Sequence, residues 1–406
     1  MRGSLLARME ADVKRARVIG AATFLAAAVF SLTCSQSRTE PPPPLQWESA
    51  IADQFFPASI LSVAGVPAKP GNSQILCDPK SSFRVRVKSS QPNTRVHVEV
   101  KMDTFSLETS SCDVVLQNAG QEYVIAPTPR WDMHKLAYND QPYPTTVVIR
   151  VTANGNFLGE RTQRLQMRAI NDVPIEQLDE QGHPVWFSLD LFGGFVNENS
   201  PVVDQLLHEA IGWNAVQKFT GYDGSSDSVR MQVFAIWNVL QHRGVKYSDI
   251  SKASGFSQRI VSQSVRFVDQ TLNSSQANCV DGSVLFASVL YKIGIYPVLA
   301  TTPNHMFVGY YKLKDAVGND FHTAPVHDLD FLETTMIGGE TPTKKPFDAS
   351  HKPEDSESYA QFRGALQRGE QEFEQEIREN WKARKPGYGL MSVRNLRARG
   401  INPIPR

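Results

Sequence analysis

The most informative segment of the chain reads Gln276-Ala277-Asn278-Cys279-Val280-Asp281-Gly282-Ser283-Val284-Leu285-Phe286-Ala287-Ser288-Val289-Leu290-Tyr291-Lys292-Ile293-Gly294. A polar segment ends at a single cysteine, and apolar residues then run nearly all round a helical wheel, which is typical of a helix buried in a domain core. Cys279 would begin that helix, where unpaired backbone N–H groups and the helix dipole stabilise a thiolate. Gly294 is expected to end the helix, and 296–300 reads as a short buried strand. The pattern therefore predicts a cysteine nucleophile.

Composition and charge restrict the class of protein. The chain has 406 residues, of which 41% are hydrophobic and 21% charged, so it can form two or three globular domains. Its formal net charge is zero, but residues 1–33 hold five Lys or Arg and two Asp or Glu. Without them the chain has 42 − 5 = 37 basic and 42 − 2 = 40 acidic side chains. A slightly acidic remainder argues against nucleic-acid binding.

The first 33 residues are predicted to be an export signal. Basic residues precede an apolar run over 18–32. This run is too short for a membrane-spanning helix, which needs about 20 residues, and suits the apolar part of a signal peptide. Cys34 follows in the setting Ser31-Leu32-Thr33-Cys34, an imperfect bacterial lipoprotein signal because the leucine is one place late and threonine replaces a small residue. Lipidation of Cys34, ordinary cleavage and an uncleaved anchor all remain open. Residues 34–46 contain four consecutive prolines and are predicted to be a stiff linker.

Residues 47–170 show an alternation of apolar and polar residues. Val96, Val98 and Val100, for example, alternate with polar residues, and turn clusters separate several such runs. This pattern predicts an all-β sandwich, and an immunoglobulin-like one is the expectation. Cys77 and Cys112 both fall in this region, where an oxidising compartment favours a disulfide over two buried thiols. With that pairing, Cys279 has no partner and is either reactive or deeply buried.

The pattern changes from strands to helices after a predicted connector at 171–199, which carries the apolar cluster Val185-Trp186-Phe187. Ser200-Pro201 is a typical helix start. Further helices are predicted over 226–242 and about 258–271, followed by the cysteine helix and then by strands. Helices before strands predict an α+β domain with an antiparallel sheet.

Two strands after the cysteine helix carry the rest of the predicted chemistry. His305 begins the aromatic and β-branched run 305–311, and 330–335 reads as a short strand that contains Glu333. A thiol that attacks an acyl carbon needs a base, and an imidazole base needs an acceptor that fixes its tautomer. Cysteine, histidine and a carboxylate at these places can supply all three groups.

These residues carry a resemblance to a known family. The order Cys279, His305, Glu333, with Asn-Cys-Val-Asp-Gly-Ser before an apolar helix and a Pro-x-His-x-Phe-Val-Gly strand, resembles the transglutaminase-like branch of the papain-like cysteine enzymes. It is similar to bacterial members that read as cysteine proteases or peptidases. The resemblance covers about 200–340, which is under half of the chain.

The resemblance implies a role for each site residue. Cys279 would be the nucleophile, His305 the base and Glu333 the third member. The family usually has Asp at the third place, and Glu is one methylene longer, so Asp328 and Asp330 remain as alternatives. The family also needs an oxyanion donor, for which Gln276 is a candidate beside the backbone N–H of Cys279.

Other kinds of chemistry have weaker support in the sequence. The remaining histidines and cysteines lack the spacing of metal ligands, so we predict no metal and no cofactor. A P-loop and a Gly-x-Ser-x-Gly motif are both absent.

The region 346–406 is predicted to be a charged helical extension that follows an enzyme domain at 200–345. A helix over 358–384 would pack a thin apolar stripe on that domain, and 394–406 would be a disordered or loosely docked tail. Contact of this basic tail with anionic lipid or peptidoglycan is the minor alternative.

The sequence thus predicts an exported enzyme, periplasmic or in the outer envelope of a bacterium. It would act on amide or peptide bonds of a protein or peptide through a thioester, as a hydrolase or as an acyltransferase. The alternative is a catalytically inactive module of the same fold that serves in binding or assembly. The sequence does not predict an oligomeric state.

Overall fold

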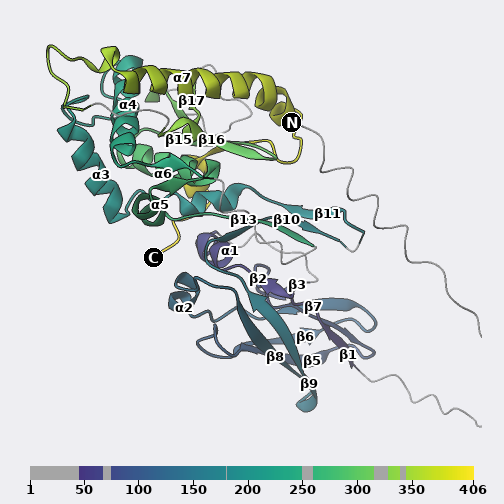
Figure 1. Ribbon diagram of the computed structural model, residues 1–406. Coiled ribbons are helices and arrows are strands. Elements are labelled where there is room, and N and C mark those ends of the chain that lie inside the picture. Colours follow the sequence, from purple (N-terminus) through teal and green to yellow (C-terminus); the bar gives the residue numbers. More distant parts are fainter. Residues whose placement is uncertain (1–44, 67–74, 180, 249–258, 315–327, 339–343) are drawn as a thin grey trace, which may run out of the picture. The chain divides into compact units, whose positions relative to one another are not determined.

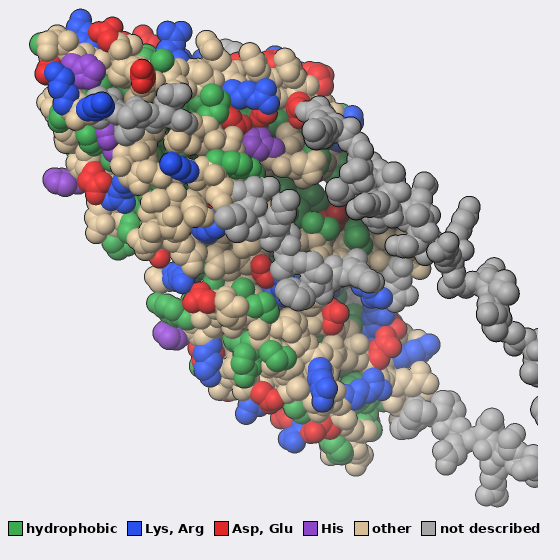
Figure 2. All heavy atoms as spheres, in the orientation of Figure 1, with side chains coloured by type: hydrophobic (Ala, Val, Ile, Leu, Met, Phe, Trp, Pro, Cys, Tyr) green, Lys and Arg blue, Asp and Glu red, His purple; other side chains and the backbone are tan. Residues whose placement is uncertain are grey.

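The computed structural model describes residues 45–66, 75–179, 181–248, 259–314, 328–338 and 344–406 (Figure 1). The predicted signal, Cys34 and nearly all of the predicted linker lie outside these ranges. Within them, no helix has the length and apolar character needed to span a membrane. On the face shown in Figure 2, basic and acidic side chains are interspersed over the described residues.

Two β-sheets form the first part of the described chain (Figure 1). In β5 (Thr94–Met102), the predicted alternation is confirmed, because Val96, Val98 and Val100 are buried while their neighbours are partly or fully exposed. The four-stranded sheet has the order β1-β4-β7-β3 and the five-stranded sheet the order β2-β9-β8-β5-β6. Their other strands are β1 Leu45–Ser49, β2 Gln54–Phe55, β3 Ile75–Cys77, β4 Val85–Ser89, β6 Ser110–Leu116, β7 Glu122–Ala126, β8 Tyr143–Ala153 and β9 Asn156–Met167, with short helices α1 Pro57–Ser62 and α2 Met133–Ala137.

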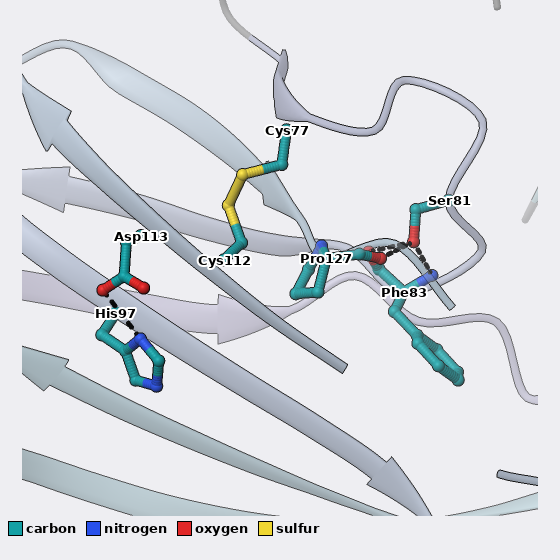
Figure 3. Close-up of a disulfide and its surroundings, with 7 residues drawn as sticks. All are labelled: Cys77, Ser81, Phe83, His97, Cys112, Asp113 and Pro127. Carbon is teal, nitrogen blue, oxygen red and sulfur yellow. Dashed lines mark hydrogen bonds and ion pairs between the residues drawn. A yellow bond between two sulfur atoms is a disulfide. The ribbon is translucent and has the colours of Figure 1, made fainter. Parts of the chain in front are cut away.

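A disulfide joins the edges of these two sheets, as Figure 3 shows. Cys77 ends β3, an edge strand of the four-stranded sheet, and Cys112 lies in β6, an edge strand of the other sheet. Their Cα atoms are 6.4 Å apart. The predicted pairing of Cys77 with Cys112 is therefore confirmed.

The segment expected to be a connector, 171–199, contains β10 (Asp172–Leu178), β11 (Pro184–Phe187) and the 3-10 helix η1 (Asp190–Phe195). In a three-stranded sheet, β10 lies between β11 and β13 (Ile260–Ser264). The helix predicted over about 258–271 is thus wrong, because its first half is β13 and only α5 (Val268–Ser274) is helical. Ile260 and Val261 pair with β10, and this tertiary pairing overrides the helical spacing of Val261, Val265 and Val268.

The other predicted helices are present. Helix α3 (Pro201–Gly212) begins after Ser200, and α4 (Ser226–His242) has the predicted bounds. Helix α6 (Cys279–Lys292) begins at Cys279 and is buried over most of its circumference, and Gly294 follows with φ 80°. Two short strands, β12 (Lys246–Tyr247) and β14 (Gln276–Ala277), pair in parallel just before α6.

An antiparallel sheet of order β17-β16-β15-β18 lies beside α6. Both of its faces are covered: Met306 and Val308 belong to the same core as α6, whereas Phe307 and Phe331 pack with Phe373 of the C-terminal region. Burial on both faces explains why 305–311 is apolar without alternation. The strands are β15 Pro297–Thr302, β16 His305–Tyr311, β17 Leu329–Leu332 and β18 Gly389–Ser392; β17 ends earlier than predicted and the 3-10 helix η4 (Thr334–Met336) follows.

The C-terminal region packs on this sheet. It contains α7 (Glu357–Glu372), the π-helix η6 (Phe373–Ile377), α8 (Arg378–Lys382), β18 and α9 (Val393–Ala398). The loosely docked tail predicted over 394–406 is wrong, since Ile401 and Ile404 are buried and the Ile404 N–H donates to the Gly194 carbonyl at 2.8 Å. Arg397 is neutralised by Glu198 at 3.1 Å, so apolar burial outweighs the basic character of the segment.

Removing the disulfide should destabilise the chain. The bridge closes a loop with a sequence separation of 35 residues, so chain entropy predicts a loss of about 4 kcal/mol in unfolding free energy for the Cys77→Ala/Cys112→Ala variant. Urea denaturation of the wild type, with and without dithiothreitol, measures the loss. The double variant should not respond to dithiothreitol, and a wild type that does not respond either would contradict the bridge.

Candidate active site

A capping box fixes the start of α6. The Asn278 side chain accepts a hydrogen bond from the Asp281 N–H at 2.8 Å, and the Asp281 carboxylate accepts one from the Asn278 N–H at 3.1 Å. The same carboxylate, which is fully buried, accepts from the N–H and the guanidinium of Arg266, each at 2.7 Å. Cys279 is therefore held as the first residue of the helix.

The thiol of Cys279 can be reached from a cavity. Cys279 is half-buried and, with Val280 and His305, lines a cavity of about 440 Å³. This volume lies in the range of small-molecule sites, about 300–1,000 Å³. Because Cys279 and Val280 are the first two residues of α6, their N–H groups have no acceptor within the helix. The positive end of the helix is thus available to an anion beside the thiol.

Strand register brings His305 and Glu333 together. Val308 of β16 lies opposite Leu332 of β17, so Glu333, the next residue, comes opposite Phe307. Because side chains alternate between the faces of a sheet, Glu333 lies on the same face as Phe307 and His305. The His305 Nε2 lies 2.7 Å from Glu333 Oε2. The other oxygen of Glu333 accepts from the N–H and the hydroxyl of Thr335, at 2.9 and 2.6 Å. The structure therefore places this predicted pair in direct contact.

Neither alternative acid is placed against His305 by the contacts that the structure shows. Asp330 Oδ2 accepts from the Arg230 guanidinium at 2.9 Å and from the Tyr310 hydroxyl at 3.1 Å. Asp328 precedes β17, and its carbonyl accepts from the Lys312 N–H at 2.9 Å. Of the three acids named from the sequence, Glu333 is the one that the described structure places against His305, and its extra methylene does not prevent the contact.

The charges of the site favour a protonated imidazole. Burial lowers the pKa of His305, but hydrogen bonds to Cys279 and Glu333, together with their charges, outweigh burial and raise the pKa to about 10. Because Nε2 faces Glu333, Nδ1 is the ring nitrogen left for the thiol. Burial raises the pKa of Glu333, but its hydrogen bond to His305 and the imidazolium charge prevail and lower the pKa below its usual range. The result is an imidazolium paired with a carboxylate.

Gln276 lies on β14 and is half-buried. Among the described residues that line the cavity, Gln263 of β13 is present and Gln276 is not. The oxyanion role of Gln276 stays a prediction. Gln263 was missed because its segment was predicted to be helical.

A second carboxylate lies beside His305. Glu372, the last residue of α7, has its Oε2 3.4 Å from His305 Nε2. Within the described ranges, His305, Glu333 and Glu372 are the one group of three whose donor atoms lie within 4.8 Å of one another. These are ligand types for a divalent cation. The 2.7 Å separation of His305 and Glu333, however, is that of a hydrogen bond, which a cation between them would break.

Part of the cavity wall comes from segments outside the predicted enzyme domain. Ile175 and Phe187 of β10 and β11 form one part of the lining, and Pro386 and Gly387 of the C-terminal region form another. The sequence carried one signal for this wall, the apolar cluster Val185-Trp186-Phe187, whose members are all partly exposed in the structure.

Comparisons with known proteins give weak likenesses. No family model and no curated protein matches the chain. Among solved structures, a candidate cysteine protease from Cytophaga hutchinsonii is similar with 11% identity and a TM-score of 0.21, over 61% of this chain and 73% of that one. A red sea bream transglutaminase is similar with 10% identity and a TM-score of 0.19, over 70% of this chain and 53% of that one. At these scores the likenesses do not define the fold. The structure shows an α+β chain in which Cys279 and His305 line one cavity and Glu333 contacts His305.

Proposed function

We propose that this chain is a cysteine enzyme of transglutaminase-like fold in which Cys279, His305 and Glu333 act on an amide or peptide bond. One observation carries the proposal. The thiol at the N-terminus of a buried helix opens onto a cavity that the imidazole of His305 also lines, and this imidazole is 2.7 Å from a buried carboxylate. This is the arrangement that nucleophilic acyl transfer requires.

The first step is attack of the Cys279 thiolate on the carbonyl carbon. A C–S bond forms, and the carbonyl π electrons move to oxygen. The oxyanion that results lies at the start of α6, where the Cys279 N–H donates to it. The His305 imidazolium then gives its proton to the amine nitrogen as the C–N bond breaks, which leaves a thioester and a neutral imidazole.

The second step resolves the thioester. Neutral His305 takes a proton from water or from an incoming amine, whose oxygen or nitrogen attacks the thioester carbon. The C–S bond breaks and returns the thiolate. Water makes the chain a protease or amidase, and an amine makes it a crosslinking acyltransferase. Glu333 holds the imidazole in the required tautomer throughout.

The remaining expectations form part of the same proposal. Two β-sheets whose edge strands are joined by a disulfide support an immunoglobulin-like sandwich before the enzyme domain. A buried helix before an antiparallel sheet supports the transglutaminase-like assignment. The disulfide supports export to an oxidising bacterial envelope, with attachment through lipidated Cys34 as one route and a protein or peptide as substrate.

Alkylation of Cys279 tests the proposal without a known substrate. In a Cys34→Ser background, iodoacetamide should modify Cys279 rapidly at pH 7, because His305 holds it as a thiolate, whereas a free thiol has a pKa of about 8.5. His305→Ala should slow the reaction at pH 7 roughly tenfold, since the lost thiolate fraction outweighs the higher nucleophilicity of a more basic thiol. Mass spectrometry of the alkylated peptide against time gives the rates.

Cys279→Ala serves as the unlabelled control in that experiment, because Cys77 and Cys112 are bridged. Modification that occurs only after denaturation would contradict the enzyme. It would favour instead the inactive binding or assembly module that the sequence left open.

Glu333 should set the pH at which Cys279 reacts. It accepts a hydrogen bond from the imidazolium, so Glu333→Gln should destabilise the ion pair and raise the pH midpoint of alkylation by about one unit. Asp328→Asn removes an alternative acid that the structure does not place at His305, and it should leave the midpoint unchanged. The opposite ranking of the two variants would make Asp328 the third member.

A further inference from the structure

The two oxygens of Glu372 have different surroundings. Oε1 accepts from the Arg368 guanidinium at 2.6 Å, one helical turn earlier on α7, where Arg368 is half exposed. Oε2 is buried, accepts no hydrogen bond from the described residues and lies 3.4 Å from His305 Nε2. The side chain thus reaches from the surface to the nitrogen that Glu333 also contacts.

Helix α7 is held close to β17 at the same level. Gly369 lies one turn before Glu372, and a Cβ added to it would be 2.5 Å from the Phe331 carbonyl oxygen, so only glycine allows this approach of helix to strand. The Glu333 N–H donates to the Ala365 carbonyl of α7 at 3.1 Å. The helix therefore positions the backbone of Glu333 and the carboxyl group of Glu372 together.

The carboxyl group of Glu372 is influenced by charged neighbours from three elements. Glu333 follows β17, His305 begins β16, and Arg368 lies one turn before Glu372 on α7. Burial and the charge of Glu333 raise the pKa of Glu372, against the effect of His305 and Arg368. Glu372 therefore takes up a proton more readily than a free glutamate, and a protonated carboxyl group can donate to Glu333.

We infer that Glu372 is a positioning residue for the proposed triad: by hydrogen bonding next to Nε2, it keeps the His305–Glu333 pair aligned with Cys279. The inference rests on the proposed function and extends it, because the active site is then incomplete without the C-terminal region. Glu372 is not among the described residues that line the cavity of Cys279, and its contact is with Nε2 of His305. Its effect passes through His305.

Two substitutions of similar size separate hydrogen bonding from packing. Glu372→Gln keeps the length of the side chain and its ability to hydrogen-bond, whereas Glu372→Met keeps the length alone. We expect Glu372→Met to slow alkylation of Cys279 at pH 6 about threefold or more. This loss of rate corresponds to a rise of about half a unit in the pH midpoint of alkylation. Glu372→Gln should remain within about twofold of the wild type.

The experiment uses the full chain with its disulfide intact and Cys34→Ser, and it records iodoacetamide rates from pH 5 to pH 9 together with thermal unfolding midpoints. Glu376→Ala is the matched control, because Glu376 lies one turn further along, is exposed and has no part in the site. Its pH profile should coincide with that of the wild type.

Each outcome has a defined meaning. A Glu372→Met profile equal to that of the wild type overturns the inference, while fast labelling that depends on His305 keeps the proposed function. Equal losses of rate in the Met and Gln variants would assign the effect to charge and would also overturn it. A lower unfolding midpoint without a change in the pH profile would make Glu372 merely structural. A wild-type Cys279 that does not react below pH 8 removes both proposals.

Discussion

The buried carboxylate of Asp281 is the constraint on which the site depends. An ionised carboxylate without solvent costs several kcal/mol unless it is paired and hydrogen-bonded. Here the N–H groups of Asn278 and Arg266 and the Arg266 guanidinium all donate to it. These bonds tie the first turn of α6 to the segment between β13 and α5. The place of Cys279, one residue after Asn278, follows from them.

Close backbone packing then sets the distance between α6 and the acid. A Cβ on Gly282 would lie 2.9 Å from Thr334 Oγ1, so a side chain there would push η4 away from the helix. Glu333 is the N-cap of η4, and its Oε1 accepts from Thr335 inside that short helix. The glycine three residues after the nucleophile therefore has a steric reason. It lets the carboxylate approach the cysteine helix closely enough for one imidazole to lie between them.

Local patterns in the sequence were sufficient for some parts of this site and not for others. Composition alone predicts that the helix after Cys279 and the strand 305–311 are buried, because both segments are apolar. The pairing of Cys77 with Cys112 follows from an oxidising compartment, which the export signal predicts. In contrast, β13 is a strand because β10 pairs with it, although Val261, Val265 and Val268 have helical spacing. Glu372 and Gln263 reach the site only through packing of distant segments, which leaves no local signal in the chain.

The boundaries predicted for the enzyme domain, 200–345, also miss contacts between distant segments, and these contacts contribute to stability. Strand β18 pairs with β15 from outside those boundaries, so a chain that ended at 345 would leave the backbone of β15 as an open sheet edge. It would also uncover Phe307 and Phe331, which Phe373 and Ile377 bury. Fully exposing such side chains costs about 1.5–3 kcal/mol each. The C-terminal region is therefore part of the core that holds His305 and Glu333, and the chemistry proposed for the chain depends on residues on both sides of the segment that carries its motifs.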